Sequence, residues 1–192
     1  SCTPASRPSP PKKRRLRPIH EVLLIYRSKY GSAKAYAEMA AERLGGLACT
    51  EQQATEQTLG QARCLALFGS LYAGGLSIAP FMKKHAALLG QKRAAVFAVG
   101  ATPPGPDVLE AVRARLPKAV QTLPLFYGRG AWDPARMTRV DRTLCRMLQR
   151  SVAKKPAGTL APWEQALLEA GQGAANWVEP RYLAPLLSFL QS

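Results

Sequence analysis

The chain has 192 residues, 47% of them hydrophobic and 20% charged, which is typical of one globular domain with a substantial core. No apolar run approaches the roughly 18 residues that suggest a membrane-spanning helix, and the scattered cysteines and two histidines offer no metal site at usable spacing. The formal net charge of +15 indicates an anionic partner, which would be nucleic acid, a membrane surface or an acidic small molecule. We expect a cytoplasmic protein whose cysteines are reduced.

The first 20 residues differ in composition from the rest of the chain. They contain five prolines and six basic residues without an acid, so we expect a disordered tail over 1–20 and one domain over 21–192. The KKRR run in this tail resembles a nuclear-localisation or nucleic-acid-binding patch, and a solvated leader is the alternative.

The first predicted elements are a strand, a helix and a second strand. Residues 22–26 form a short continuous apolar run, which is typical of a strand buried on both faces. Residues 32–44 predict a helix, because alanines and a leucine recur on one face and Gly45 and Gly46 stop it. Residues 47–50 suggest a short second strand.

A strand and a longer helix follow. Residues 64–68 predict another buried strand, which leads into the loop GSLYAGG. Apolar residues between 78 and 89 then recur at helical spacing and predict one helix that ends at Gly90. His85 lies on the apolar face of this helix, where a histidine at the boundary of the core is more usual than a catalytic base.

The next segment repeats the alternation of strand and helix. Residues 94–99 predict a third strong strand, which is followed by the loop GATPPGP and by a helix over about 107–116. Residues 119–126 suggest a fifth strand. Strands that alternate with helices through short loops predict an α/β fold with a parallel sheet covered on both faces.

Residues 134–155 depart from this alternation and predict a basic amphipathic helix with Asp133 as its N-cap. Its apolar side could complete the core, or the helix could dock on an anionic surface or grip an acidic ligand such as a porphyrin carrying propionates. Two more helices are expected over about 161–170 and 179–190. The basic sector of the first helix consists of Arg139, Arg142, Arg146 and Arg150, and the opposite apolar side of Met137, Val140, Leu144, Met147 and Leu148.

Three predicted strands end in conspicuous loops, RSKYGS, GSLYAGG and GATPPGP. In an open parallel sheet these strand ends meet at one edge, where ligands bind. The first loop opens a helix, whose unpaired N–H groups and positive dipole can hold a phosphate. Gly31 permits a tight turn close to the anion, and Ser28 and Ser32 add hydroxyl donors. A capped helix start without a ligand is the alternative.

Two familiar nucleotide motifs are missing, because the first strand is not followed by GxGxxG and the chain contains no GxxxxGK[ST]. A mononucleotide held without a Walker lysine is the natural remaining ligand. No pair of acids and no Cys/His arrangement looks catalytic.

The stretch IYRSKYGSAKAYAEMAAERL resembles the FMN phosphate loop of flavodoxin-like proteins. The resemblance continues through LFGSLYAGGLSIAPFMKKH, VFAVGATPP and LFYGRGAWDPARMTRVDRTLCRML, and so covers about residues 21–155. The chain is similar to the bacterial flavodoxin-domain proteins that resemble the quinone-dependent protoporphyrinogen oxidase, which carry an extra basic amphipathic stretch near the same place. The resemblance implies a flavodoxin-like open five-stranded parallel sheet with helices on both faces, and FMN as the cofactor.

The same resemblance implies which residues bind FMN. Tyr72 is the aromatic residue that we expect to stack on the flavin, with packing at the base of its loop as the alternative. Ala33 stands where a threonine is usual, so one hydroxyl that would face the phosphate is lost. The expected residues are Ser28, Lys29, Tyr30, Gly31, Ser32 and Ala33 around the phosphate, Ser70, Leu71, Tyr72, Ala73 and Gly74 on one side of the flavin ring, and Gly100, Ala101 and Thr102 on the other.

These observations leave three functions open. The first is an FMN-dependent redox protein that passes electrons to or from a protein or small-molecule partner. The second is a flavin oxidoreductase of the protoporphyrinogen-oxidase type, acting with a quinone at the inner face of the membrane. The third, a nucleic-acid-binding module, is the weakest, because no helix-turn-helix or RNA-binding signature is present. Ordinary flavodoxins are acidic, so the positive charge of this chain favours an anionic substrate or surface over the usual flavodoxin partners.

Overall fold

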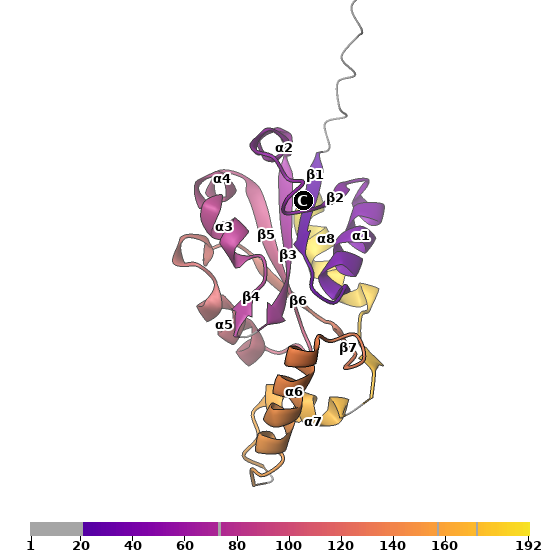
Figure 1. Cartoon of the computed structure of the whole chain (residues 1–192). Helices are drawn as coiled ribbons and strands as arrows, with labels where there is room; N and C mark the ends of the chain where they lie inside the picture. The colour runs from indigo at the N-terminus through magenta and orange to yellow at the C-terminus, as the bar shows by residue number, and fades with distance from the viewer. Residues whose placement is uncertain (1–20, 73, 157, 172) are drawn as a thin grey trace, which may run out of the picture.

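The computed structural model describes residues 21–72, 74–156, 158–171 and 173–192. The tail predicted over 1–20 therefore lies outside the described residues. In the described part, five parallel strands form the central sheet in the order β2-β1-β3-β5-β6 (Figure 1). These strands are β1 (Val22–Arg27), β2 (Leu47–Thr50), β3 (Cys64–Tyr72), β5 (Arg93–Gly100) and β6 (Leu125–Arg129).

Helices cover both faces of the sheet (Figure 1). The first and last helices pack on one face, while three helices from the middle of the chain cover the other. The predicted fold class, a flavodoxin-like open parallel sheet with helices on both faces, is confirmed. The first pair is α1 (Ser32–Leu44) and α8 (Ala184–Gln191), and the second group is α3 (Ala79–Lys84), α4 (Ala86–Gly90) and α5 (Pro106–Arg115).

The continuous apolar runs explain why the strands are buried on both sides. Successive side chains of a strand point to opposite faces of its sheet. In β1, Leu23 and Ile25 belong to the core that includes α3, α4 and α5, whereas Val22 and Leu24 pack in the core that includes α1 and α8. An alternating strand would have only one apolar face, so this run suits a sheet that is covered twice.

The helix predicted over 78–89 is wrong in one respect, because it is divided into α3 and α4. The backbone at His85 leaves the helical region, with φ −107° and ψ 19°. The His85 ring packs against Phe81, with 4.5 Å between ring centroids. Both short helices keep their apolar residues on the sheet, so the periodicity is the same on either side of the break.

The fifth predicted strand is present, but the bounds predicted for it, 119–126, are wrong. Residues Lys118–Val120 form a 3-10 helix, and β6 begins only at Leu125. Val120 and Leu123 are buried at a spacing of three, which suits a turn that packs on the core and not a strand. Pro117 and Pro124 bound this turn, and the carbonyl of Pro124 accepts the N–H of Val96 at the start of the sheet pairing.

The inserted helix predicted over 134–155 is present but starts later. It is α6 (Arg139–Val152), and its N-cap is Thr138, whose hydroxyl oxygen accepts the N–H of Asp141. Asp133 therefore does not cap α6, and its carboxylate instead accepts the N–H of Ala135 in the preceding turn. In Figure 1, α6 and α7 (Pro162–Ala170) lie beyond the edge at which the parallel strands end.

A short ribbon joins this insertion to the body of the protein. Strands β7 (Ala131–Trp132) and β8 (Ala175–Asn176) pair antiparallel, so the chain leaves and re-enters at neighbouring points. The predicted last helix is divided into a 3-10 helix over Pro180–Leu183 and α8. The sequence analysis did not predict β7 and β8, β4 (Gly75–Leu76) or α2 (Glu56–Gln61).

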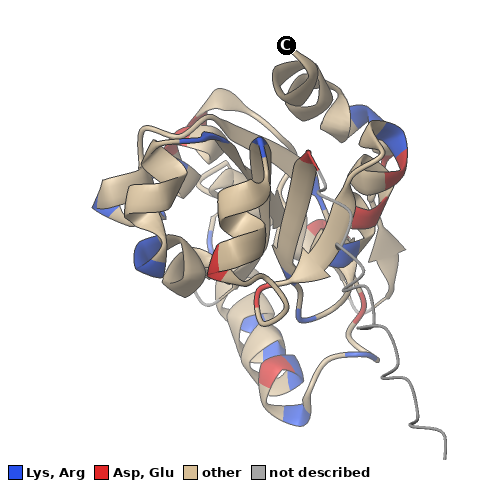
Figure 2. Cartoon of the chain, turned by 90° about the horizontal axis from the view of Figure 1, so that it is seen from above, with Lys and Arg blue, Asp and Glu red and all other residues tan. Residues whose placement is uncertain are grey.

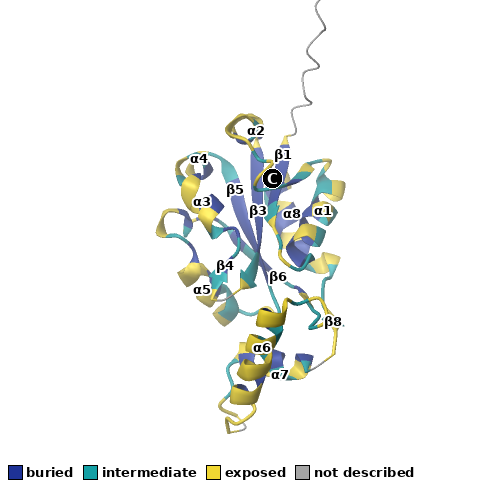
Figure 3. Cartoon of the chain, in the orientation of Figure 1, coloured by how far each residue is buried: buried dark blue, intermediate teal, exposed yellow. Residues whose placement is uncertain are grey.

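Charged and exposed residues are rare in the central strands and common in the helices and loops. Figure 2 shows that the central strands carry almost no charged residues, which lie instead on helices and loops. Figure 3 shows buried central strands and a largely exposed α6. None of the helices in the described residues has the length and hydropathy of a membrane span.

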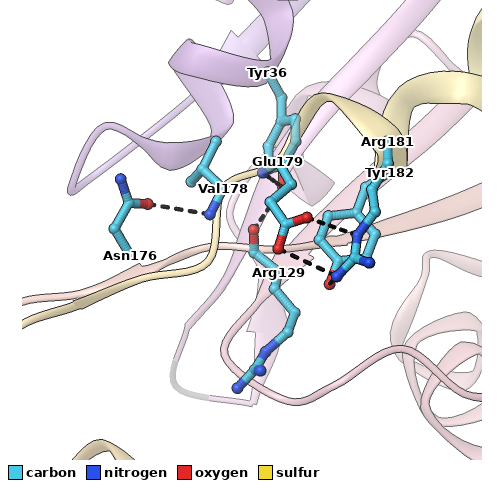
Figure 4. Close-up of polar contacts among 7 residues, drawn as sticks. All are labelled: Tyr36, Arg129, Asn176, Val178, Glu179, Arg181 and Tyr182. Atoms are coloured by element: carbon cyan, nitrogen blue, oxygen red, sulfur yellow. Dashed lines mark hydrogen bonds and ion pairs between the residues drawn. The ribbon is translucent and has the colours of Figure 1, made fainter.

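The buried phenol of Tyr36 ties three segments together (Figure 4). It lies on α1, donates to the carbonyl of Arg129 at the end of β6 (2.6 Å) and accepts the N–H of Glu179 (3.2 Å). Burial raises the pKa of the Tyr36 phenol to about 12, so it stays protonated. The chain that returns from the insertion is thereby fixed to the sheet.

Candidate functional site

The three predicted loops lie at one edge of the sheet, as expected. Strands β1, β3 and β5 are neighbours, with Arg27 opposite Gly69 and Ser70 opposite Val99. Ser77 joins the first two strand ends, because its hydroxyl donates to the carbonyl of Arg27 (2.8 Å) and accepts the N–H of Ser70 (2.9 Å). The loops therefore leave from a fixed base.

The first loop ends at an open helix start. Gly31 is the N-cap of α1 with φ +98°, and no side chain caps this helix among the described residues. A Cβ at Gly31 would have nothing within 4 Å, so space is open in front of the first turn. Unpaired N–H groups and the positive end of the dipole make such a helix start a place for an anion.

The hydroxyl oxygens of the two serines in this loop accept backbone hydrogen bonds and so stabilise its shape. The Ser28 hydroxyl oxygen accepts the N–H of Gly31 at 3.0 Å and so closes the turn. Ser32 is buried, and its hydroxyl oxygen accepts the N–H of Ala131 at 2.9 Å. Each hydroxyl still has a hydrogen to donate, but the backbone of α1 is the more accessible set of donors.

The second loop is tighter than predicted. Strand β3 extends to Tyr72 and turns back into β4, so Leu71 pairs with Leu76 and Tyr72 with Gly75. Gly74 has φ +82°, which suits a glycine at the tip of this hairpin. Tyr72 is 43% exposed, and the Lys29 ammonium lies 4.0 Å from the centroid of its ring. Ala73 lies outside the described residues.

The third loop is held by two side chains of β6 that the sequence did not single out. The Tyr127 hydroxyl donates to the carbonyl of Thr102 (2.8 Å), and Arg129 Nε donates to the carbonyl of Ala101 (2.9 Å). Gly100 is required here, because a Cβ would lie 2.6 Å from the Tyr127 hydroxyl oxygen. Burial raises the pKa of Tyr127, so this hydroxyl remains a donor.

Arg129 also carries a donor without a partner. Its Nη2 atom is buried and makes no hydrogen bond within the described residues. The guanidinium lies over the Trp177 ring, 4.0 Å from the centroid, and its Nε is used by Ala101. Buried polar atoms in proteins are usually paired, so an unpaired guanidinium nitrogen near the third loop is consistent with a ligand contact.

The site contains one acidic residue that the sequence analysis missed. Asp141, in the first turn of α6, lies 2.6 Å through Oδ2 from Lys29 Nζ and accepts hydrogen bonds from the hydroxyls of Tyr30 and Tyr72. Lys29, followed by the two tyrosines, holds the pKa of Asp141 well below its usual range, and the carboxylate raises the pKa of Lys29. The sequence signal was available, because Asp141 is the only acid within the basic α6.

In the described part of the chain, His85 and the three cysteines form no arrangement for catalysis. His85 is buried beside Phe81, and burial, followed by Lys84, lowers its pKa. Cys49, Cys64 and Cys145 are free thiols. Among the described residues, no group of three metal-ligating side chains is close enough to hold an ion.

These features fit a phosphorylated flavin. The open start of α1 suits a phosphate, and the partly exposed Tyr72 ring offers an apolar face beside it. The 100–102 loop bounds the same edge, with Arg129 Nη2 as a spare donor. The residues present therefore can hold the FMN that the resemblance implied.

Comparison with solved structures finds several distant neighbours. A flavodoxin from the domain Archaea has 17% identity and a TM-score of 0.40, with 66% of this chain and 91% of that chain covered. The Trp repressor binding protein from Bacillus subtilis has 18% identity and a TM-score of 0.39, with coverages of 57% and 82%. Two-electron reduced Megasphaera elsdenii flavodoxin has 14% identity and a TM-score of 0.40, with coverages of 55% and 82%.

These structural similarities are distant, and no curated protein matches the chain significantly. The family assignment rests on a sequence family instead. The Flavodoxin_5 family model, which describes a flavodoxin domain, matches residues 23–158. This match spans well over half of the chain, so the chain belongs to the flavodoxin domain family.

Proposed function

We propose that this chain binds FMN and passes electrons to or from a protein or small-molecule partner. The observation that carries the proposal is the open start of α1, where Gly31 turns with positive φ and no side chain of the described residues caps the helix. Membership in the flavodoxin domain family supports a flavin as the ligand. Bound FMN would supply the one- and two-electron chemistry.

The backbone of α1, and not a lysine, is the main phosphate donor in this proposal. Lys29 is the only basic residue of the 28–33 turn, and its ammonium is already paired with Asp141. The N–H groups of the first turn of α1 have no competing side-chain partner among the described residues. Tyr72 and the 100–102 loop would then flank the ring of the flavin.

A titration with two flavins tests this proposal. FMN and riboflavin share the ring system, and only FMN carries the phosphate. Quenching of flavin fluorescence should show FMN binding about 100-fold more tightly than riboflavin, because only FMN has a phosphate that the N–H groups at the start of α1 can bind. Equal affinities would show that the α1 start is not a phosphate site.

A second function is favoured by the surface of α6. Its apolar residues face solvent, and a cavity of about 470 Å³ between α6 and α7 is lined by two arginines, one glutamine and three small or apolar residues. Such a surface suits an acidic ligand with an apolar body, which fits a flavin oxidoreductase of the protoporphyrinogen-oxidase type acting with a quinone at a membrane surface. The lining residues are Arg146, Gln149, Arg150, Ala153, Leu168 and Gly171.

The two functions separate in one assay. FMN-loaded protein is mixed with protoporphyrinogen and a soluble quinone, and formation of the oxidised porphyrin is followed by fluorescence. Turnover that falls when Arg146 and Arg150 are changed to glutamine would support the oxidoreductase. Reduction and reoxidation of the flavin without porphyrin turnover would leave electron transfer as the function.

A further inference from the structure

Asp141 joins three parts of the molecule that are far apart in sequence. Its carboxylate contacts Lys29 and Tyr30 in the first loop and Tyr72 in the second, while its own backbone lies in α6. Its side chain is only 6% exposed, so the contact is made inside the mouth of the site. One carboxylate therefore links the two loops that would bind the phosphate and the ring of FMN.

The charge of Asp141 opposes a second anion at this place. A flavin phosphate carries close to two negative charges and would sit at the start of α1, directly after Lys29 and Tyr30. Like charges repel each other, and Asp141 neutralises the one ammonium of that loop. Removing the carboxylate would release Lys29 for the phosphate.

The ring of FMN meets the same cluster. Stacking needs a free face of Tyr72, and Lys29 Nζ lies 4.0 Å from the centroid of that ring. The ammonium is held there by its 2.6 Å contact with Asp141, and the Tyr72 hydroxyl is itself bound to the carboxylate. A flavin that stacks on the face covered by Lys29 would displace the ammonium from the ring and so disturb its contact with Asp141.

We propose that Asp141 is an internal anion that holds α6 against the flavin site through its contacts with Lys29, Tyr30 and Tyr72, and that FMN binding breaks these contacts. We call this set of contacts the latch. The inference rests on the proposed function, because it assigns a regulation to the same site. FMN binding and the position of α6 are then linked in both directions: FMN loosens the start of α6, and a partner that draws α6 away raises the affinity for FMN.

The first experiment measures FMN affinity with the full chain. Asp141→Asn keeps the shape of the side chain and removes its charge, so we expect FMN to bind at least tenfold more tightly than to the wild type. Tyr72→Phe keeps the ring and removes one donor to the carboxylate, and we expect a gain of a few-fold. Asp133→Asn is the matched control, because it removes the same charge from the turn before α6, where Asp133 accepts the N–H of Ala135.

The second experiment follows α6 directly by hydrogen–deuterium exchange with mass spectrometry. Saturating FMN should speed exchange of the amides in residues 139–146 in the wild type. Free Asp141→Asn protein should already show the faster exchange, and FMN should change it little. Exchange in α1 should slow on FMN binding in both proteins, which reports that the ligand is bound.

The possible results separate the inference from the function on which it rests. If Asp141→Asn binds FMN with the wild-type affinity or more weakly, or if FMN slows exchange in 139–146, the latch is wrong while FMN binding stands. If neither protein binds FMN, the proposed function itself fails and the latch fails with it. Tighter binding by Asp141→Asn, together with faster exchange in wild-type α6, supports both.

Discussion

Helices α1 and α6 start at the same edge of the sheet, but their apolar sides face in opposite directions. The apolar side of α1 faces the core, and that of α6 faces solvent. In α1 the apolar side is buried against the sheet, with Tyr36 and Ala40 fully inaccessible. In α6 the apolar side faces solvent, with Val140 68%, Leu144 56% and Met147 61% exposed. The buried residues of α6 instead include the polar Asp141 and Gln149.

This difference shows what positions each helix. Packing of its apolar face places α1, which is the usual way for a helix in a globular protein. Polar anchors place α6: Asp141 at its first turn, Gln149 donating to the carbonyls of Leu167 (3.1 Å) and Gly171 (2.8 Å), and the ion pair of Lys155 with buried Glu164 just after it. The interpretation that the apolar side of α6 completes the core is therefore wrong. We propose that this exposed apolar row is an interaction surface.

The largest effect is expected at the α1 side of this comparison, from a side chain that fills the open space in front of the helix. Gly31→Val puts a β-branched residue at φ +98°, which costs roughly 1–3 kcal/mol, and its side chain fills the open space in front of the helix. We expect FMN affinity to fall by a factor of 100 or more in a fluorescence-quenching titration, with no change in binding to vesicles.

Gly105→Val is the matched control for this change. Gly105 is also the N-cap of a helix with open space around it, but its φ of −172° is extended backbone that any residue adopts. We expect this variant to bind FMN within a few-fold of the wild type. Equal losses in both variants would mean that a general disturbance, and not the α1 start, causes the effect.

A second prediction tests whether the exposed side of α6 meets an anionic surface. Arg139, Arg146 and Arg150 are exposed, whereas Arg142 donates to the carbonyls of Ala135 and Met137 and belongs to the fold. Each arginine near an anionic bilayer contributes roughly 1 kcal/mol, so changing the three exposed ones to glutamine should reduce partitioning about 100-fold. Sedimentation with anionic and neutral vesicles measures this, while FMN affinity should stay unchanged.

The control for the arginine variant removes the same charge elsewhere. Arg63, Lys83 and Lys118 are exposed basic residues on the body of the protein, and their change to glutamine should leave partitioning within a few-fold of the wild type. The basic tail is present in every protein compared, so it does not contribute to the difference. Similar losses in both triple variants would show that net charge alone, and not α6, attracts the protein to vesicles.

A smaller effect is expected on the free energy of unfolding when the buried hydroxyl of Tyr36 on α1 is removed. Tyr36→Phe leaves the carbonyl of Arg129 and the N–H of Glu179 without their partner, which should lower the free energy of unfolding by about 1–3 kcal/mol (Figure 4). Denaturant unfolding measures the loss, and Tyr26→Phe, at a partly exposed tyrosine of β1, serves as control. A loss no larger than in Tyr26→Phe would show that the Tyr36 hydrogen bonds do not stabilise the fold.

The sequence predicted the body of the protein well, for physical reasons that act locally. Continuous apolar runs indicated the strands that are covered on both faces. The spacing of apolar residues and the glycines after Leu44 predicted α1 with its observed bounds. The predicted elements were wrong where buried apolar residues lie in a turn, as at Val120 and Leu123. Strands of two residues were missed, because they are too short to show a hydrophobic periodicity.

The site was predicted in part. The three loops follow from strand order, which the alternation of strands and helices implies. The orientation of α6 does not follow from its pattern, because an amphipathic period does not say which side faces the protein. The role of Asp141 depends on contacts with Lys29 and Tyr72, and those residues are more than 60 positions away, so only the fold brings them together.

The smallest effect is expected at His85, which lies in the α3–α4 break on the sheet face opposite α1. Because burial lowers its pKa, the folded state favours the neutral ring, and the protein loses stability as pH falls below the ordinary histidine pKa near 6.5. Its buried position beside Phe81 marks a structural residue, so His85→Asn should leave flavin reduction and reoxidation rates within a few-fold of the wild type at pH 7.5. Stopped-flow absorbance of the FMN-loaded protein measures both rates. A loss of about 100-fold, with FMN still bound, is the size expected from removing a general acid or base and would make His85 part of the chemistry.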